Sequence, residues 1–156
     1  IQGDEPLIDP GAIQTAVLAL LDDAGCQMAT LIKRISKPEE IENPNVVKVV
    51  TALDGHALYF SRSLLPYPRG EAVHFKHIGL YVYRRALLLA YSGLRRGPLE
   101  AAEKLEQLRA LENGILIRVA ETDYETLGVD TPDDLIAAEA ALSLAQFSTS
   151  SLIHHG

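Results

Sequence analysis

The stretch VVKVVTALDGHALYFSR, residues 46–62, predicts a β-hairpin in the middle of the chain. Two runs rich in β-branched and aromatic residues, 46–52 and 57–62, flank the pair Asp54 and Gly55. An Asp-Gly pair between such runs is a strong hairpin signal, because the turn needs residues that tolerate positive φ. The chain is therefore expected to contain at least one antiparallel strand pair.

Helices and strands alternate on both sides of this hairpin. Asp9 and Pro10 are typical of a helix start, and Gly25 is a natural helix end. The other expected elements are strands at 28–35, 74–84 and 115–121, a short helix at 85–94, one longer helix from Pro98 to Gly114, and a helix at 130–142. This order favours an α/β sheet with an antiparallel insertion. The sequence has no glycine-rich βα turn and no Walker-type loop.

Composition limits the class of protein. The 156 residues, 47 % of them hydrophobic, suffice for one domain with a core. The net charge of −7 argues against nucleic acid as the main partner. No apolar run approaches the roughly 18 residues of a membrane span. The single cysteine, Cys26, excludes an internal disulfide framework, fits a reducing compartment and is interpreted as a small core residue.

Several polar residues could carry chemistry, and each also has a structural interpretation. Asp4 and Asp130 follow strand-like segments and could hold Mg²⁺ together, or could be a turn residue and a helix cap. His77 lies among aromatic residues of an expected strand and could be structural. Arg62 could end its strand in water or bind a carboxylate with two hydrogen bonds.

Two further groups of residues are most simply interpreted as structural, one as packing residues and the other as a helix face exposed to solvent. Tyr81 and Tyr83 alternate along one strand, so they should share one face of the sheet and pack in a core or an interface. Glu106, Gln107 and Arg109, taken alone, would form the solvated face of the helix from Pro98 to Gly114. Leu105 and Leu108 would supply its buried face.

Six segments stand in the order found in 3-deoxy-manno-octulosonate cytidylyltransferase, also called CMP-Kdo synthetase. They are QGDEP (2–6), NPNVVKVV (43–50), ALYFSR with PYPR (57–62 and 66–69), KHIGLYVYR (76–84), LEQLRALENG (105–114) and GVDTPDDL (128–135). The chain resembles this family up to about residue 142. The resemblance implies an α/β fold like that of nucleotide-diphospho-sugar transferases, Rossmann-like and with a mixed sheet.

In that family QGDEP ends a central strand in the middle of the protein. The resemblance therefore implies that the family's N-terminal nucleotide-binding half is missing from these residues. We expect residues 1–147 to be the C-terminal part of a single cytidylyltransferase domain and residues 148–156 to be a tail. Without the other half, the 156 residues alone are expected to be inactive.

The resemblance also implies a reaction: CTP and Kdo give CMP-Kdo and pyrophosphate, with Mg²⁺, for lipopolysaccharide biosynthesis in the cytoplasm. Asp4 and Asp130 would be the catalytic, metal-binding residues. The sugar pocket would contain Gln2, Arg62, His77, Tyr81, Glu106 and Gln107. No nucleic-acid or membrane partner is expected, and a homodimer is, with 64–72 and 75–83 as candidate surfaces.

Two alternatives to this function stay open at the level of sequence. One is a cytidylyltransferase for a related acid sugar, such as 8-amino-Kdo or a sialic acid. The other is a non-catalytic fragment that dimerises or binds a sugar acid.

Overall fold

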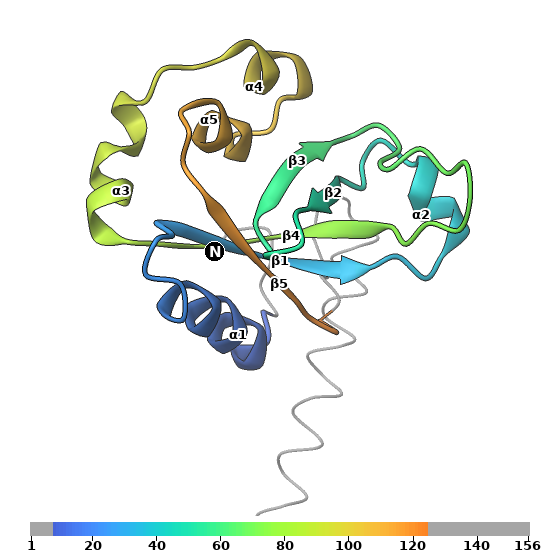
Figure 1. Cartoon of the computed structure of the whole chain (residues 1–156), viewed down its shortest axis with the longest axis horizontal. Helices are drawn as coiled ribbons and strands as arrows, with labels where there is room; N and C mark the ends of the chain where they lie inside the picture. Colours follow the sequence, from blue (N-terminus) through green and yellow to red (C-terminus); the bar gives the residue numbers. More distant parts are fainter. Residues whose placement is uncertain (1–7, 125–156) are drawn as a thin grey trace, which may run out of the picture.

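A computed structural model describes residues 8–124, which form a five-stranded mixed sheet with helices on both faces (Figure 1). The strands are β1 (Met28–Arg34), β2 (Lys48–Thr51), β3 (Ala57–Ser61), β4 (Phe75–Tyr83) and β5 (Ile117–Glu121). Their order in the sheet is β3-β2-β4-β1-β5. Only the β1–β5 pair is parallel, and the other described pairs are antiparallel. The predicted α/β sheet with an antiparallel insertion is confirmed.

The hairpin that joins β2 to β3 forms at the predicted turn. Gly55 has φ of +82°, a conformation that a residue with a Cβ rarely adopts. A Cβ at this position would also lie 2.8 Å from Nη1 of Arg118, which reaches across from β5. Glycine is therefore required here both for the turn and for the close approach of the arginine.

The helices are α1 (Pro10–Leu21), α2 (Pro38–Glu42), α3 (Arg85–Ala90), the 3₁₀ helix η1 (Tyr91–Gly93), α4 (Pro98–Glu103) and α5 (Gln107–Glu112). Helix α1 begins as predicted, since the Asp9 carboxylate accepts a hydrogen bond of 2.9 Å from the Gly11 amide. It ends at Leu21, before Gly25. The short helix α2 was not among the expected elements.

The prediction of one long helix from Pro98 to Gly114 is wrong. The structure has two short helices, α4 and α5, because Lys104 adopts a left-handed conformation with φ of +57° and ends α4. The chain changes direction there before α5 begins at Gln107. The interpretation of residues 106, 107 and 109 as one solvated helix face fails for the same reason: Gln107 is only 4 % exposed.

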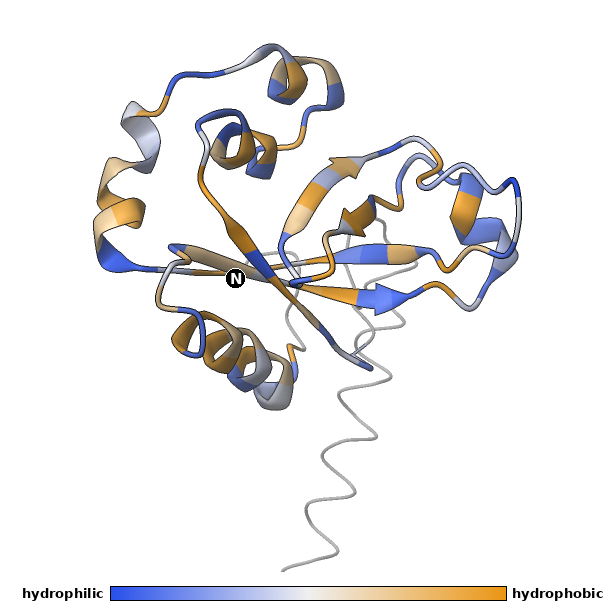
Figure 2. Ribbon diagram, viewed as in Figure 1, coloured by the Kyte–Doolittle hydropathy of each residue, from blue (hydrophilic) through white to orange (hydrophobic). Residues whose placement is uncertain are grey.

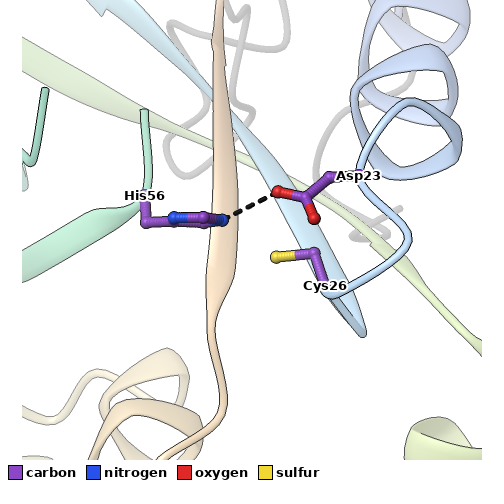
Figure 3. Close-up of side chains that lie close together, drawn as sticks. All are labelled: Asp23, Cys26 and His56. Atoms are coloured by element: carbon purple, nitrogen blue, oxygen red, sulfur yellow. Dashed lines mark hydrogen bonds and ion pairs between the residues drawn. The ribbon is translucent and has the colours of Figure 1, made fainter. Parts of the chain in front are cut away.

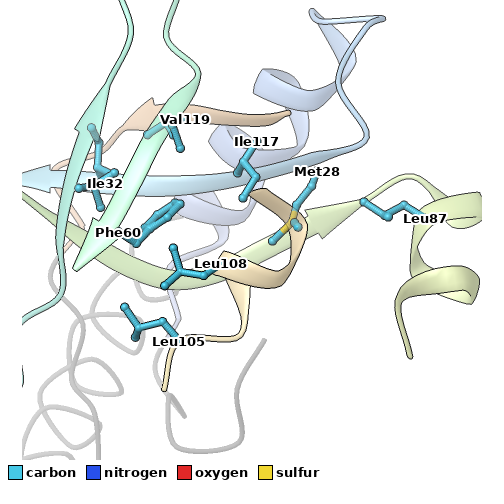
Figure 4. Packing of buried hydrophobic residues seen from close by; sticks show 11 residues of the cluster. Met28, Ile32, Phe60, Leu87, Leu105, Leu108, Ile117 and Val119 are labelled. Atoms are coloured by element: carbon cyan, nitrogen blue, oxygen red, sulfur yellow. The ribbon is translucent and has the colours of Figure 1, made fainter. Parts of the chain in front are cut away.

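In the described part of the chain, hydrophobic residues are packed on both faces of the sheet. On one face Met28, Phe60 and Leu108 pack together between the strands and α5 (Figure 4). On the other face Ala16 of α1 packs against Leu31 of β1 in a smaller cluster. Hydrophobic residues accordingly run along α1 and β5 (Figure 2). Strand β1 is therefore buried on both faces from Met28 to Ile32, whereas β4 alternates between buried and half-buried residues.

The helices within residues 8–124 include none that has the length and hydrophobicity needed to cross a membrane. Cys26 is 1 % exposed, which confirms its interpretation as a core residue. The expected helix at 130–142 and the tail at 148–156 lie outside the described residues. The division of the chain at residue 147 stays a prediction.

Candidate active site

A pocket of about 450 Å³ opens where β4, the end of β3 and the α4–α5 connection meet. Five residues singled out from the sequence line it: Arg62, His77, Tyr81, Glu106 and Gln107. They come from three segments that are far apart in the sequence. The structure therefore brings together every candidate sugar-binding residue that lies within residues 8–124.

The break between α4 and α5 shapes one wall of the pocket. The left-handed residue Lys104 lines it together with the three residues that follow, Leu105, Glu106 and Gln107. The Tyr91 hydroxyl fixes this segment by donating a hydrogen bond of 2.9 Å to the Glu106 carbonyl. The pocket therefore depends on the bend that the sequence did not predict. In one continuous helix these side chains would point in different directions around the helix axis and would not all line the pocket.

Gln107 has an unusual environment for an amide side chain. It is 4 % exposed and lines the pocket, yet its side chain makes no hydrogen bond to any residue between 8 and 124. Buried polar groups in native proteins nearly always have a partner, and an unpaired one costs about 1–3 kcal/mol. The amide is thus placed to form hydrogen bonds with a polar ligand in the pocket.

His77 also lines the pocket and lies on strand β4. Its ring packs edge-on against Phe60 and obliquely against Tyr81, each at 5.2 Å between ring centroids. Its Nε2 lies 2.8 Å from the hydroxyl oxygen of Thr30 on β1. Burial lowers the pKa of His77 to about 3. The imidazole is therefore neutral at pH 7.

Three tyrosines continue the row of rings that begins at His77. Tyr81 and Tyr83 are 6.1 Å apart and share one face of the sheet, as predicted, and Tyr91 meets Tyr83 edge-on at 5.6 Å. Burial raises the pKa of Tyr81 and raises that of Tyr83 to about 12. Both phenols are therefore protonated near neutral pH and can donate a hydrogen bond to a ligand.

Arg62 directly follows β3, and its backbone and side chain are both fixed. Its amide donates 3.0 Å to the Glu103 carboxylate, and its Nε donates 3.0 Å to the Glu103 carbonyl. Its Nη1 donates 3.1 Å to the Pro44 carbonyl. Nη2 makes no hydrogen bond to the part of the chain that the structure describes. A held guanidinium with one free nitrogen at a pocket is suited to bind a carboxylate.

Lys48 supports this arrangement from inside the sheet. It is fully buried, and its ammonium group donates to three carbonyl oxygens: 2.8 Å to Asn43, 2.6 Å to Val46 and 2.7 Å to Arg62. Burial, followed by repulsion from Arg62, lowers the pKa of Lys48. The lysine thus ties the turn before β2 to the residue after β3.

Three candidate residues, Gln2, Asp4 and Asp130, lie outside the described residues. The pocket also contains residues that the sequence reasoning did not assign to a site: Val47, Gly79, Tyr83, Lys104 and Leu105. Tyr83 could have been found from its alternation with Tyr81. No sequence pattern indicates Lys104, because lysine has no preference for the left-handed conformation.

A comparison of the chain with known proteins identifies its family. A family model described as Cytidylyltransferase matches residues 1–119. The chain belongs to the cytidylyltransferase family. Within this family it is similar to 3-deoxy-manno-octulosonate cytidylyltransferases of Solibacter usitatus, 62 % identical over 138 residues, and of Syntrophotalea carbinolica, 54 % identical over 153 residues.

The match to the Solibacter protein covers 86 % of this chain and 55 % of that protein. The match to the Syntrophotalea protein covers 91 % of this chain and 61 % of that protein. The chain thus spans little more than half of the length of these curated relatives. It is also similar to a solved structure of CMP:2-keto-3-deoxy-manno-octonic acid synthetase complexed with CTP. That match has a TM-score of 0.86 and 44 % identity, and covers 93 % of this chain and 61 % of the other. The mixed α/β fold expected from the resemblance is confirmed.

This cytidylyltransferase chain has a second polar cluster, away from the pocket (Figure 3). His56, next to the β2–β3 turn, lies between two carboxylates: Nε2 is 2.8 Å from Asp23 and Nδ1 is 3.1 Å from Asp54. The ligand atoms of Asp23, Cys26 and His56 lie within 4.8 Å of one another, a spacing that could hold a metal ion. However, the Cys26 thiol donates to the Leu116 carbonyl, and burial raises its pKa.

Charge also disfavours a metal at this cluster, because the Arg118 guanidinium donates to the Asp54 carbonyl beside it. We therefore interpret Asp23, His56 and Asp54 as a clasp that joins the segment after α1 to the hairpin. The hydrogen bond to Asp54 is the largest cause that raises the pKa of His56. Hydrogen bonds from His56 lower the pKa of both carboxyl groups.

The clasp predicts a pH dependence of stability. His56 has a raised pKa in the folded state, so its stabilisation is complete below its unfolded value of 6.5 and is lost as pH rises through the folded pKa. The two carboxyl groups contribute above their unfolded value of 3.8 and lose that contribution as pH falls through their folded pKa values. The clasp is therefore strongest between these limits.

We expect His56→Gln to lower the melting temperature most near pH 5.5 and least near pH 8.5. Thermal unfolding of the wild-type and variant proteins across this range measures the difference. A difference that stays constant with pH would show that His56 contributes packing alone. Asp54→Asn should also weaken the dependence of the melting temperature on pH, because it removes the carboxylate that contributes most to the raised pKa of His56.

Proposed function

We propose that the complete protein containing this chain transfers CMP from CTP to 3-deoxy-manno-octulosonate, giving CMP-Kdo and pyrophosphate for lipopolysaccharide biosynthesis. The observation that carries the proposal is the pocket, which joins Arg62, His77, Tyr81 and the buried amide of Gln107. The relatives named above support it, since they are 3-deoxy-manno-octulosonate cytidylyltransferases at 54–62 % identity.

The pocket offers groups of the kind that an acid sugar needs. Arg62 supplies a cation with a free N–H for the carboxylate, and the Gln107 amide and the Tyr81 hydroxyl supply hydrogen bonds for sugar hydroxyls. Gln107 is buried and Arg62 and Tyr81 are half-buried, so their hydrogen bonds to a ligand would be less weakened by water than at an open surface. The role of the pocket residues is therefore to bind and orient the sugar so that one hydroxyl points toward the nucleotide.

In the proposed reaction that hydroxyl oxygen attacks the α-phosphorus of CTP. A new P–O bond to the sugar forms, the bond from the α-phosphorus to the bridging oxygen breaks, and pyrophosphate leaves. The hydroxyl proton passes to solvent or to a base. Mg²⁺, when bound, would neutralise the charge on the phosphate oxygens. By resemblance Asp4 and Asp130 would hold the metal, and both lie outside the described residues.

The proposal is tested by pyrophosphate release from the full-length protein in the presence of CTP, Kdo and Mg²⁺. We expect release to require all three components. Asp4→Asn and Asp130→Asn should each lower kcat about 100-fold or more, because each removes a charged ligand of the metal. Full activity in both variants would contradict the metal assignment. A higher kcat/KM for 8-amino-Kdo or a sialic acid than for Kdo would reassign the sugar.

We also propose that the protein acts in the cytoplasm as a homodimer. Of the two candidate surfaces, 64–72 is the more accessible, since Tyr67 is 77 % exposed. The other, 75–83, is strand β4, which lies between β2 and β1 inside the sheet. An exposed tyrosine on a loop is typical of an interface residue. Light scattering of the full-length protein should give twice the mass of one chain, and Tyr67→Glu should shift it toward the monomer.

A further inference from the structure

Thr30 lies behind His77 and is buried completely in the sheet. Its hydroxyl oxygen has three polar neighbours: Nε2 of His77 at 2.8 Å, the Leu80 carbonyl at 2.8 Å and the Ile78 carbonyl at 3.3 Å. A threonine hydroxyl has one proton to donate and lone pairs to accept. The three neighbours therefore compete for a single proton, and their chemistry decides where it goes.

Carbonyl oxygens can only accept a hydrogen bond. If the Thr30 proton pointed to His77, two oxygens 2.8 Å apart would face each other at Leu80 with no proton between them. That repulsive contact is avoided when Thr30 donates to Leu80. Its lone pair then faces His77, and Nε2 must carry the proton of the imidazole.

We infer that Thr30 is a positioning residue, which holds His77 as the tautomer protonated at Nε2 and leaves Nδ1 to accept a hydrogen bond from a ligand hydroxyl. Nδ1 has no hydrogen-bond partner among residues 8–124, and His77 lines the pocket. The neutral state of the ring at pH 7 supports this assignment, since a cationic ring would have a proton on both nitrogens. The inference deepens the proposed function, on which the identity of the ligand rests.

The backbone explains why Thr30 meets two carbonyls. The β1–β4 pairing has a register shift between Thr30 and Leu31: Thr30 lies opposite Tyr81, whereas Leu31 lies opposite Ile78. Gly79 and Leu80 are the extra residues of β4 at this bulge. Bulges redirect side chains and often lie beside functional sites. Here the bulge and the threonine together set the orientation of the histidine.

The tautomer selects the chemistry of the bound group. A carboxylate oxygen can only accept, so it would be repelled by the Nδ1 lone pair, whereas a hydroxyl can donate to it. We therefore assign the His77 side of the pocket to a sugar hydroxyl and the Arg62 side to the carboxylate. The two ends of an acid sugar would then be distinguished by the protein.

The test uses the full-length protein with ¹⁵N-labelled histidine, in which NMR distinguishes protonated from unprotonated ring nitrogens. We expect Nδ1 of His77 to give the signal of an unprotonated nitrogen in the wild type and in Thr30→Ser. Thr30→Val should move the signals toward the other tautomer, because it removes both the acceptor for Nε2–H and the donor to Leu80. Thr15→Val, on α1, removes a threonine hydroxyl that donates to Gly11 and should leave these signals unchanged.

Kinetics give the second readout. Thr30→Val should raise KM for Kdo about tenfold, the effect of one hydrogen bond, with little change in KM for CTP, and Thr30→Ser should restore it. A proton on Nδ1 in the wild type would overturn the inference. So would a Thr30→Val variant with the wild-type tautomer and a raised KM, since Thr30 would then act through packing. If the tautomer is as inferred but no CMP-Kdo forms, the positioning role stands and the proposed function fails.

Discussion

Replacing Arg62 with lysine in the full-length protein should raise KM for Kdo about 30-fold and leave KM for CTP nearly unchanged. The factor corresponds to about 2 kcal/mol, which is typical of a hydrogen bond to a charged group. The physical reason is the rigid support of the guanidinium: Nε and Nη1 are held by the carbonyls of Glu103 and Pro44, and Nη2 is left for the ligand. A lysine has one terminal nitrogen and cannot bind the support and the ligand with the same geometry.

Arg84→Lys is the matched control for this experiment. Arg84 also donates to backbone carbonyls, 2.7 Å to Leu20 and 3.4 Å to Asp23, but it does not line the pocket. Its replacement should lower the melting temperature without changing KM for either substrate. An equal rise in both KM values for Arg62→Lys would contradict the assignment of Arg62 to the sugar, and would indicate a general disturbance of the site.

The backbone carbonyl of Arg62 accepts a hydrogen bond from Lys48. Because Lys48 donates to that carbonyl and to the turn before β2, the position of the arginine depends on a buried cation that never meets the ligand. A strand pattern cannot reveal such a role. Lys48 lies between valines in VVKVV, and its complete burial depends on three carbonyls that come together only in the folded state.

The elements that the sequence predicted well are those with local causes. The Asp54-Gly55 turn and the capped start of α1 each depend on residues within a few positions of one another, and both are confirmed. The division of α4 from α5 has no local cause that a single sequence displays, because lysine has no preference for the left-handed conformation. Tertiary contacts decide it: the Glu103 side chain is held by Ser61 and Arg62, 41–42 residues earlier.

The candidate site shows the same contrast. Arg62, His77, Tyr81, Glu106 and Gln107 were predicted through the resemblance of their motifs, and the structure places all of them at one pocket. Their physical environment could not be predicted in that way. The burial of Gln107 depends on the bend at Lys104, and the contact between Thr30 and His77 depends on the β1–β4 bulge.

The second large effect is expected at Glu100, which holds the two short helices together. Glu100 is 4 % exposed, and its carboxylate accepts two hydrogen bonds from Arg109 of α5, at 2.8 Å from Nε and 2.5 Å from Nη2. The pair lowers the pKa of Glu100 and raises that of Arg109. Glu100→Gln would leave the half-buried guanidinium uncompensated. We expect it to lower the free energy of unfolding by about 3 kcal/mol, measured by urea denaturation of the full-length protein.

Arg96→Gln is the control on the same carboxylate. The Arg96 side chain is 74 % exposed and lies 3.2 Å from Glu100, so its loss should cost less than about 1 kcal/mol. The pH dependence has a definite sign: because the pKa of Glu100 is lowered, the difference between wild type and Glu100→Gln should persist above pH 4.5 and shrink as the pH falls through the folded pKa.

A double substitution separates the net value of the pair from the penalty of breaking it. Replacing Glu100 with leucine and Arg109 with methionine removes both charges together, and buried ion pairs replaced by apolar residues of similar size often lose little stability. The double variant should therefore be more stable than Glu100→Gln alone. If it is less stable, the ion pair contributes net stability to the α4–α5 bend. Since that bend carries Glu106 and Gln107, either variant should also raise KM for Kdo to the extent that the bend is displaced.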